Sequence, residues 1–261
     1  MKKTWKTLGM AVLSIGILAG CGSQVAQTES GATIIEEGKL TFAVSGEFKP
    51  FSYMDENNEL TGYDVEVGNA IAEELGLEPV AEKIKFASII SSVKSDRVDI
   101  AVASHTINDK RLEEVNFSTP YYYSGPQIFT RPDSDIETVE DLTDMEVAVS
   151  KGSTYQEDAA EYTDNIATYD SDITALRALA DGRHDAVITD FITGKEAIGE
   201  GFEIEGRELL GRSEQAVAVS KEDEQLLEDI NEALETLRED GTLTELSKKY
   251  FGEDISVDPE E

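Results

Sequence analysis

The sequence predicts an α/β fold built from two similar lobes. Short apolar strands alternate with helical stretches along most of the chain, which is the pattern of α/β proteins. The segment S-D-R-V-D-I-A-V-A-S at 95–104 is echoed by D-G-R-H-D-A-V-I-T-D at 181–190, and T-F-A-V-S-G at 41–46 by E-V-A-V-S-K-G at 146–152. Short strand–helix units can also resemble one another by chance, and chance similarity is the alternative to an internal repeat.

Composition limits the classes of partner. The chain has 261 residues, of which 55 are acidic and 22 basic, for a formal net charge of −33 at pH 7. This charge argues against nucleic-acid binding and against adhesion to anionic lipid through basic patches. The length suits two modest lobes or one large domain.

The N-terminus has the features of an export signal. Lys2, Lys3 and Lys6 precede an apolar run at 8–19, which is too short for an ordinary membrane span. Leu18-Ala19-Gly20 then precede Cys21, the only cysteine, and this resembles a bacterial lipobox. We expect residues 1–20 to be removed as a signal peptide and Cys21 to be acylated, the alternatives being an uncleaved signal or a chance cysteine. The polar residues 21–33 are predicted to form a flexible tether.

The elements of the first half follow from apolar spacing and from stop signals. Pro50 ends the first strand, a polar D-E-N-N turn predicts a hairpin, and Gly76 is placed to stop a helix. We expect strands at 39–44, 80–84 and 100–103, and helices at 65–75 and 87–94.

The second half continues the alternation. Ser153 or Thr154 would cap one helix, and Ser220 with Asp223 resembles a capping box for a later one. We expect extended or strand segments at 127–130, 146–149, 186–188 and 216–219, a helical turn at 139–142, and helices at 155–162, 173–180, 191–198, 226–237 and 242–250.

The stretch 99–125 carries the clearest chemistry. A strand ends in Ser104-His105-Thr106, and Asn108 is a good N-cap that places Arg111 in the first helical turn. A guanidinium, a hydroxyl and free backbone N–H groups then converge, which suits a small carboxylate. An ordinary strand–turn–helix with a solvated arginine would have the same residues. Because open α/β sheets bind ligands beyond the carboxyl ends of their strands, the internal repeat predicts a cleft shared by two lobes.

Seven motifs, in this order, give the chain a family resemblance. They are F-K-P-F-S-Y from Phe48, L-T-G-Y-D-V-E-V from Leu60, S-H-T-I-N-D-K-R from Ser104, F-S-T-P-Y-Y-Y-S-G from Phe117, K-G-S-T-Y from Lys151, D-G-R-H-D-A-V-I-T-D from Asp181 and D-G-T-L-T-E-L-S-K-K-Y-F-G from Asp240. Over about 40–252 the chain resembles the bacterial extracellular solute-binding proteins of family 3, the amino-acid receptors of ABC importers.

This resemblance implies a two-lobed, periplasmic-binding-protein-like fold of type II. Lobe 1 would comprise 34–124 and 214–261, lobe 2 would comprise 125–213, and the crossings near 121–125 and 214–216 would act as hinges around a ligand cleft. The implied protein is an extracytoplasmic, non-enzymatic monomer without a cofactor. It is anchored in the cell membrane by lipid on Cys21, and it delivers an L-amino acid to an ABC permease. An enzyme on the same fold, such as a cyclohexadienyl or arogenate dehydratase, is the alternative.

The resemblance also implies roles for individual residues. Arg111 corresponds to the arginine that binds the ligand's α-carboxylate, with further donors from Thr106 and Thr154; a planar guanidinium suits this because it can bind both carboxylate oxygens. Asp190, helped by the Ser104 carbonyl, would take the α-ammonium. Phe48 and Phe86 would be aromatic walls, and Asp64 is expected to be structural. Helix capping by Thr154 and Asp190 and a core role for Phe86 are the alternatives.

Departures from the family pattern bear on specificity. Many receptors for basic residues or glutamine have an acid where this chain has Ser45, which argues against lysine or arginine, although Glu47 is close. His105 stands where an apolar residue is usual. Two histidines without a clustered partner predict no metal site.

Overall fold

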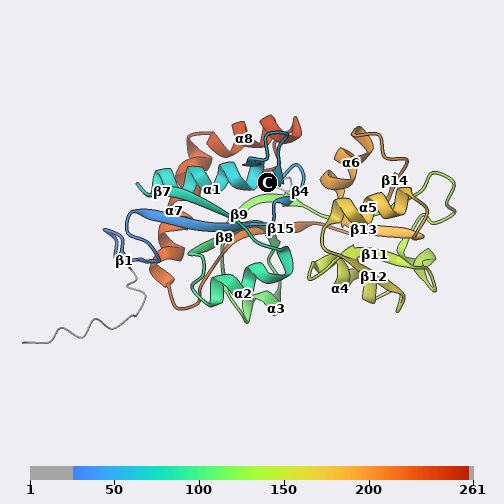
Figure 1. The fold of residues 1–261 in the computed structure, drawn as a ribbon, viewed down its shortest axis with the longest axis horizontal. Coiled ribbons are helices and arrows are strands. Elements are labelled where there is room, and N and C mark those ends of the chain that lie inside the picture. Colours follow the sequence, from blue (N-terminus) through green and yellow to red (C-terminus); the bar gives the residue numbers. More distant parts are fainter. Residues whose placement is uncertain (1–25, 259–261) are drawn as a thin grey trace, which may run out of the picture.

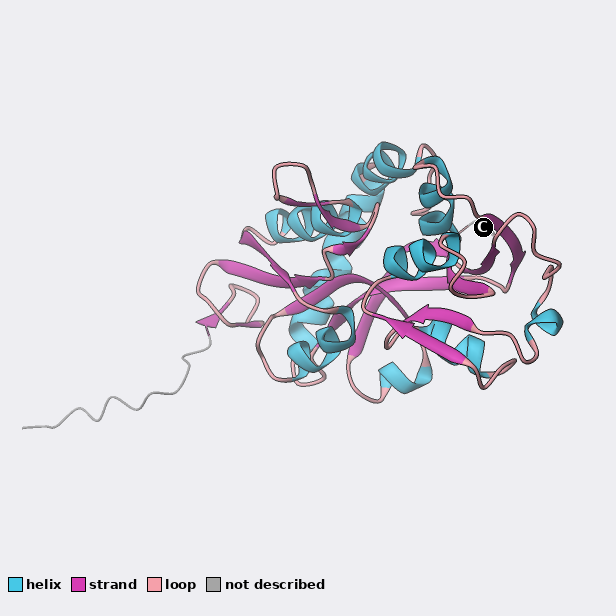
Figure 2. Cartoon of the chain, turned by 45° about the vertical axis from the view of Figure 1, so that its right-hand side comes forward, coloured by secondary structure: helices cyan, strands magenta, loops and turns pink. Residues whose placement is uncertain are grey.

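The computed structural model describes residues 26–258 and divides them into two lobes, each built on a five-stranded sheet (Figure 1). The strand order is β7-β3-β8-β15-β9 in lobe 1 and β12-β11-β13-β10-β14 in lobe 2. In both lobes the strands form a layer with helices packed around it (Figure 2). The predicted two-lobed α/β architecture is therefore confirmed.

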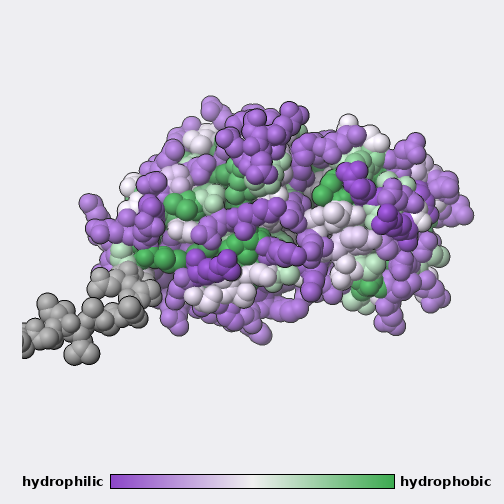
Figure 3. Space-filling view, viewed as in Figure 1, coloured by the Kyte–Doolittle hydropathy of each residue, from purple (hydrophilic) through white to green (hydrophobic). Residues whose placement is uncertain are grey.

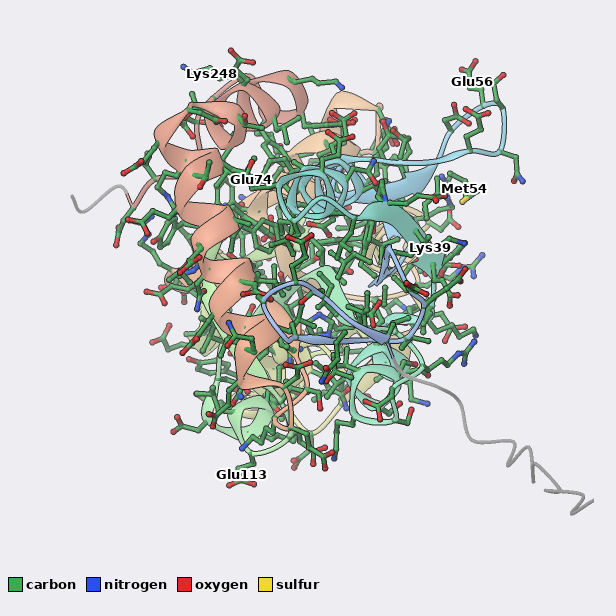
Figure 4. All side chains as sticks on the ribbon, turned by 90° about the vertical axis from the view of Figure 1, so that its left-hand side faces the viewer. Lys39, Met54, Glu56, Glu74, Glu113 and Lys248 are labelled. Carbon is green, nitrogen blue, oxygen red and sulfur yellow. The ribbon has the colours of Figure 1, made fainter. Side chains whose placement is uncertain are left out.

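Lobe 1 holds both ends of the described chain. Its main strands are β3 (Lys39–Val44), β7 (Glu78–Lys83), β8 (Ile100–Thr106), β9 (Asn116–Ser124) and β15 (Ser213–Val219). Its helices are α1 (Tyr63–Glu74), η1 (Phe86–Ser88), α2 (Ile89–Lys94), α3 (Asp109–Leu112), α7 (Glu224–Glu239) and α8 (Thr242–Phe251). A small sheet of β4 (Glu47–Phe48), β5 (Ser52–Met54) and β6 (Leu60–Thr61) extends from it, and Glu56 lies near the tip of the β5–β6 loop (Figure 4).

Lobe 2 is formed by the middle of the chain. Its strands are β10 (Pro126–Thr130), β11 (Val147–Ser150), β12 (Ile166–Tyr169), β13 (Ala186–Asp190) and β14 (Glu205–Leu209). Its helices are η2 (Val139–Leu142), α4 (Thr154–Ala160), α5 (Asp172–Ala180) and α6 (Phe191–Gly199). β11 runs parallel to β12 and β13, whereas β10 is antiparallel to β13 and β14.

Each central strand is buried on both faces, which explains the apolar runs of the sequence. In β3, Phe42 packs toward α1, α7 and α8, while the adjacent Ala43 packs toward α2. In β11, Val147 and Val149 face α4, while Ala148 faces α5 and α6. Side chains alternate along a strand, so one short run supplies two separate cores in each lobe.

The chain crosses between lobes twice, on two strands that pair with each other. β9 leads into β10 at Gly125, and β14 leads back into β15 through 210–212; Ser124 is paired with Ser213. A Cβ on Gly125 would lie 2.1 Å from the Gly211 carbonyl oxygen, so only glycine permits this approach. Because Ser213 already belongs to the lobe 1 sheet, the second crossing lies just before the predicted hinge at 214–216.

The predicted flexible tether is wrong for residues 26–33. This segment forms a hairpin of β1 (Ala26–Gln27) and β2 (Thr33–Ile34), and Ala32 is fully buried. The Thr33 amide donates to Asp223 Oδ2 at 2.6 Å, and Ser30 Oγ donates to Asp229 Oδ2 at 2.5 Å. These contacts attach the hairpin to lobe 1 at α7 and its cap. The predicted signal peptide at 1–20 and Cys21 lie outside the described residues.

The structure identifies the capping residues of two helices and contains three strands that the sequence did not predict. Asp223 alone caps α7, accepting a hydrogen bond from the Leu226 amide at 2.9 Å, so the predicted capping box with Ser220 is wrong. Ser153, not Thr154, caps α4. The strands β9, β12 and β14 had not been predicted; all three lie at sheet edges.

The exposed face seen in Figure 3 is mostly hydrophilic, in agreement with the acidic composition. No helix within residues 26–258 combines the length and the apolar character needed to cross a membrane.

The packing of α6 gives a test of the lobe 2 core. We expect Gly194→Ala to destabilise the protein by about 1–3 kcal/mol, because the new Cβ would overpack the core, lying 1.9 Å from the buried Phe129 ring. Gly199→Ala in the same helix has no atom within 4 Å of its Cβ, so we expect a neutral or slightly stabilising effect, up to about 1 kcal/mol. Urea denaturation measures both; equal stabilities of the two variants would contradict the packing described.

Candidate ligand-binding site

A cavity lies between the two lobes, and the space in it that no protein atom fills, including the part open to solvent, is about 490 Å³. Lobe 1 contributes Ser45, Glu47, Phe48, Phe86, Ser104, Thr106 and Arg111, and lobe 2 contributes Ser150, Ser153, Thr154, Tyr155, Asp170, Ser171 and Asp172. The structure thus brings six of the predicted site residues together around one space: Phe48, Phe86, Ser104, Thr106, Arg111 and Thr154. Asp190 is not part of the wall. Ligand contact by each of these residues stays a prediction.

Arg111 is held by its own local turn. Asn108 caps α3 as predicted, and its Oδ1 accepts a hydrogen bond from the Arg111 amide at 2.8 Å. The guanidinium donates to the Thr106 carbonyl at 2.9 Å and, across the cleft, to the Gly152 carbonyl at 3.2 Å. No acidic side chain in the described chain forms an ion pair with Arg111. Its positive charge therefore remains available to an anion.

The lobe 2 side of the cavity is built on the start of α4. Ser153 Oγ accepts from the Gln156 amide at 3.3 Å and donates to the Ser150 carbonyl at 2.7 Å. These bonds fix the turn between β11 and α4. Thr154, the first residue of the helix, lines the cavity with its side chain free of the capping role that the sequence had suggested.

Ser104 connects the cavity to a buried polar network. It has a left-handed backbone, with φ +57°. Its hydroxyl donates to Asp64 Oδ2 at 2.8 Å, and its amide donates to the Tyr121 hydroxyl at 2.9 Å. Tyr121 in turn donates to Asp64 Oδ1 at 2.7 Å. Asp64 thus has a structural role, as expected, and complete burial raises its pKa to about 7.

Asp190 performs the capping role that was the alternative for it. Its Oδ1 accepts from the Ile192 amide at 2.9 Å at the start of α6. Its Oδ2 is buried, and no group between residues 26 and 258 meets hydrogen-bond geometry with it, the nearby Ser124 hydroxyl included. Burial raises the pKa of Asp190 to about 7. The predicted contact with a ligand ammonium would use Oδ2. This contact remains a prediction.

Two phenylalanine rings form apolar parts of the wall. Phe48 stacks on the buried Phe51 ring with 4.8 Å between centroids, which fits the structural role expected for Phe51. Phe86 stacks on His105 at 4.6 Å, and the Arg111 guanidinium lies 5.7 Å from the Phe86 centroid. Burial, and then the charge of Arg111, lower the pKa of His105 well below its usual range, so this ring is neutral. Residues 26–258 contain no cluster of side chains able to hold a metal ion.

Ion pairs join the two lobes. Lys85 contacts Asp170 at 2.7 Å, Lys110 contacts Glu157 at 2.6 Å, and Lys49 contacts Glu196 at 3.1 Å and also Glu200. Lys195 of lobe 2 contacts Glu253 of lobe 1 at 3.2 Å. Together with the Arg111–Gly152 bond, these contacts define a closed arrangement of the lobes.

Most of the lobe 2 wall was missed by sequence reasoning. Asp170, Ser171 and Asp172 follow β12, a strand that the apolar pattern did not reveal. These residues could have been found from the rule that open α/β sheets bind ligands beyond the carboxyl ends of their strands. The short run Ile166 to Tyr169 would first have had to be recognised as a strand. Ser150 and Tyr155 could have been found in the same way from the end of β11.

Two α/β lobes joined by paired crossings, with a polar cavity between them, define the class of two-lobed ligand-binding proteins. The family model of bacterial extracellular solute-binding proteins, family 3, matches residues 40–253. The L-cystine-binding protein TcyJ of Escherichia coli strain K12 is 31% identical over 255 residues, which cover 95% of this chain and 96% of TcyJ. The chain therefore belongs to family 3 of the extracellular solute-binding proteins.

Solved structures agree with this assignment. A mutant of ArgBP from T. maritima superposes with a TM-score of 0.79 at 33% identity, covering 83% of this chain and 96% of that one. The ancestral amino-acid-binding protein AncCDT-1, described as a precursor of cyclohexadienyl dehydratase, gives a TM-score of 0.77 at 29% identity, with coverages of 82% and 96%. The fold is that of the type II binding proteins, as predicted.

The buried Asp64 gives a test by pH. Its pKa is raised in the folded chain from an ordinary 3.8 to about 7, so the folded state holds a proton that the unfolded state releases between these values. This contribution to stability is complete below about pH 4 and is lost as pH rises through 7. We expect Asp64→Asn, which cannot titrate, to gain about 1–4 kcal/mol relative to wild type between pH 4 and pH 8.

Urea unfolding at both pH values measures this gain. Asp164→Asn, an exposed position outside the network, is the matched control. A constant difference between Asp64→Asn and wild type across the pH range would contradict the prediction.

Proposed function

We propose that this protein captures an L-α-amino acid between its lobes and delivers it to an ABC import permease. The observation that carries the proposal is the Arg111 guanidinium, which faces the inter-lobe cavity and lacks an acidic partner in the described chain. A planar fork of this kind binds both oxygens of an α-carboxylate. Thr106 and Thr154 add donors from the two lobes, so one ligand group contacts both.

The other end of the amino acid has matching groups. Asp190 Oδ2 is an unpartnered acceptor for the α-ammonium, assisted by the Ser104 carbonyl, and Phe48 and Phe86 pack on the side chain. Burying an ammonium without acceptors is costly, which is why a carboxylate is required there. Asp190 is fully buried in the closed form, so this contact requires ligand entry into the open cleft before closure.

The relatives support an amino acid as the ligand class. TcyJ is named for L-cystine, and ArgBP is described in other structures as arginine-bound. AncCDT-1, which lends support to the enzyme alternative, is itself described as an amino-acid-binding protein. We therefore favour a receptor without catalytic activity, acting as a monomer.

Ligand binding would drive closure because the ligand contacts both lobes. The closed surface, with its inter-lobe ion pairs, is the form that the permease would recognise. Outside the described residues, the lipobox around Cys21 supports an anchor that keeps the receptor at the outer face of the cell membrane.

Calorimetry with the twenty amino acids tests the proposal. We expect at least one to bind with micromolar or tighter affinity, and Arg111→Ala to weaken it about 100-fold or more, since charged hydrogen bonds contribute about 1.5–3 kcal/mol each. Arg183→Ala, an exposed arginine in lobe 2 paired with Asp181, is the control and should bind as wild type does. Normal binding by Arg111→Ala would disprove the site.

The anchor has its own test. Expressed in a bacterium that processes lipoproteins, the wild-type chain should incorporate radiolabelled palmitate and fractionate with membranes. Cys21→Ala removes the only thiol and should abolish both properties while leaving ligand affinity unchanged. Palmitate incorporation by Cys21→Ala would rule out the proposed anchor.

A further inference from the structure

We infer that Asp172 selects the side chain of the ligand by binding a second positively charged nitrogen group, beyond the α-ammonium. This inference rests on the proposed function, since it names the ligand class that the same cavity accepts. The group would be an ammonium or a guanidinium, as in lysine, arginine or the second half of cystine.

The cavity wall carries three carboxylates, and two of them are already neutralised. Glu47 contacts Lys83 at 3.0 Å, and Asp170 contacts Lys85 at 2.7 Å. Asp172 has no cationic partner anywhere in residues 26–258, although it is only 7% exposed. A buried carboxylate without a cation is costly, and a ligand cation would offset that cost.

The hydrogen bonds of Asp172 orient one oxygen and leave the other for a ligand. Oδ1 accepts from the Ser150 hydroxyl at 2.9 Å and from the Thr189 hydroxyl at 2.6 Å. No other described residue donates a hydrogen bond to Oδ2. The two hydroxyls come from the ends of β11 and β13, so the side chain is fixed by the sheet and not by a mobile loop. A carboxylate held in this way is preorganised for one further donor.

The surroundings of Asp172 favour a cation over a neutral donor. Asp170 and Ser171, which precede α5, line the cavity together with Asp172, the first residue of the helix. Helix α5 packs against β4, which carries Glu47 and Phe48. Glu47 and Asp170 are each paired with a lysine, so Asp172 is the wall carboxylate left without a cation. The aromatic ring of Phe48 belongs to the strand that α5 packs against, and aromatic faces attract cations. Ser45 of lobe 1 carries no charge, and its hydroxyl is hydrogen-bonded to the Ser52 hydroxyl at 3.0 Å. Asp172 supplies from lobe 2 the acid that Ser45 does not.

A purely structural role would account for part of this geometry. An acidic residue in the first turn of α5 is favourable to the helix, and the bonds to Ser150 and Thr189 join two strands to it. Such a role predicts a change in stability when Asp172 is replaced, but no change in the preference for ligand charge. The charge preference is therefore the decisive measurement.

Calorimetry on the wild-type protein should compare pairs of nearly equal shape: L-arginine with neutral L-citrulline, and L-lysine with neutral L-norleucine. L-cystine, which is net neutral but carries a second ammonium group, is a further probe. We expect a cationic ligand to bind at least tenfold tighter than the neutral ligands. Asp172→Asn should reduce that preference at least tenfold. Asp164→Asn, which replaces an exposed carboxylate of the same lobe that does not line the cavity, is the matched control and should keep the preference.

Every outcome is decisive. Equal binding of charged and neutral partners by wild type, or an unchanged preference in Asp172→Asn, overturns the inference while leaving an amino-acid receptor in place. Binding of none of the twenty amino acids or L-cystine overturns the proposed function instead. If circular dichroism shows that Asp172→Asn does not fold, Asp172→Ser, which also removes the carboxylate, replaces it.

Discussion

The pairing of β9 with β15 is the interaction on which the two-lobed structure depends. These strands carry both crossings of the chain, and Ser124 faces Ser213 at the point where they leave lobe 1. The close approach of Gly125 to Gly211 keeps the two crossings side by side. A single paired ribbon therefore restricts the relative motion of the lobes to bending and twisting, and the cavity can open without loss of either sheet.

Asp64, Asp172 and Asp190 are buried carboxylates with different hydrogen-bond partners, and of these three only Asp172 lines the cavity. Asp64 is satisfied by Ser104 and Tyr121, so it joins the cavity wall to β9 and the first crossing. Asp190 caps a helix with one oxygen, and Asp172 is oriented by two hydroxyls. Burial raises the pKa of all three.

The sequence predicted the elements whose signals are local. The two-sided burial of β3, β8, β11, β13 and β15 produces continuous apolar runs, and Asn108 is a recognisable cap. Three edge strands, β9, β12 and β14, were not predicted, whereas the edge strand β7 was; β14, E-G-R-E-L, has no buried residue and no apolar run. Asp172 escaped with β12, the strand before it. The burial of Asp190 depends on how α6 and β10 pack around it, which no spacing in the sequence reveals.

The hairpin of β1 and β2 has a mechanical consequence. It binds to α7 and its cap in lobe 1, at the end of the molecule away from lobe 2 (Figure 1). A pulling force on the chain before Ala26 is therefore borne by lobe 1 alone and does not pass through the β9–β15 ribbon. A load at the N-terminal end therefore does not act on the contacts that hold lobe 2 against lobe 1.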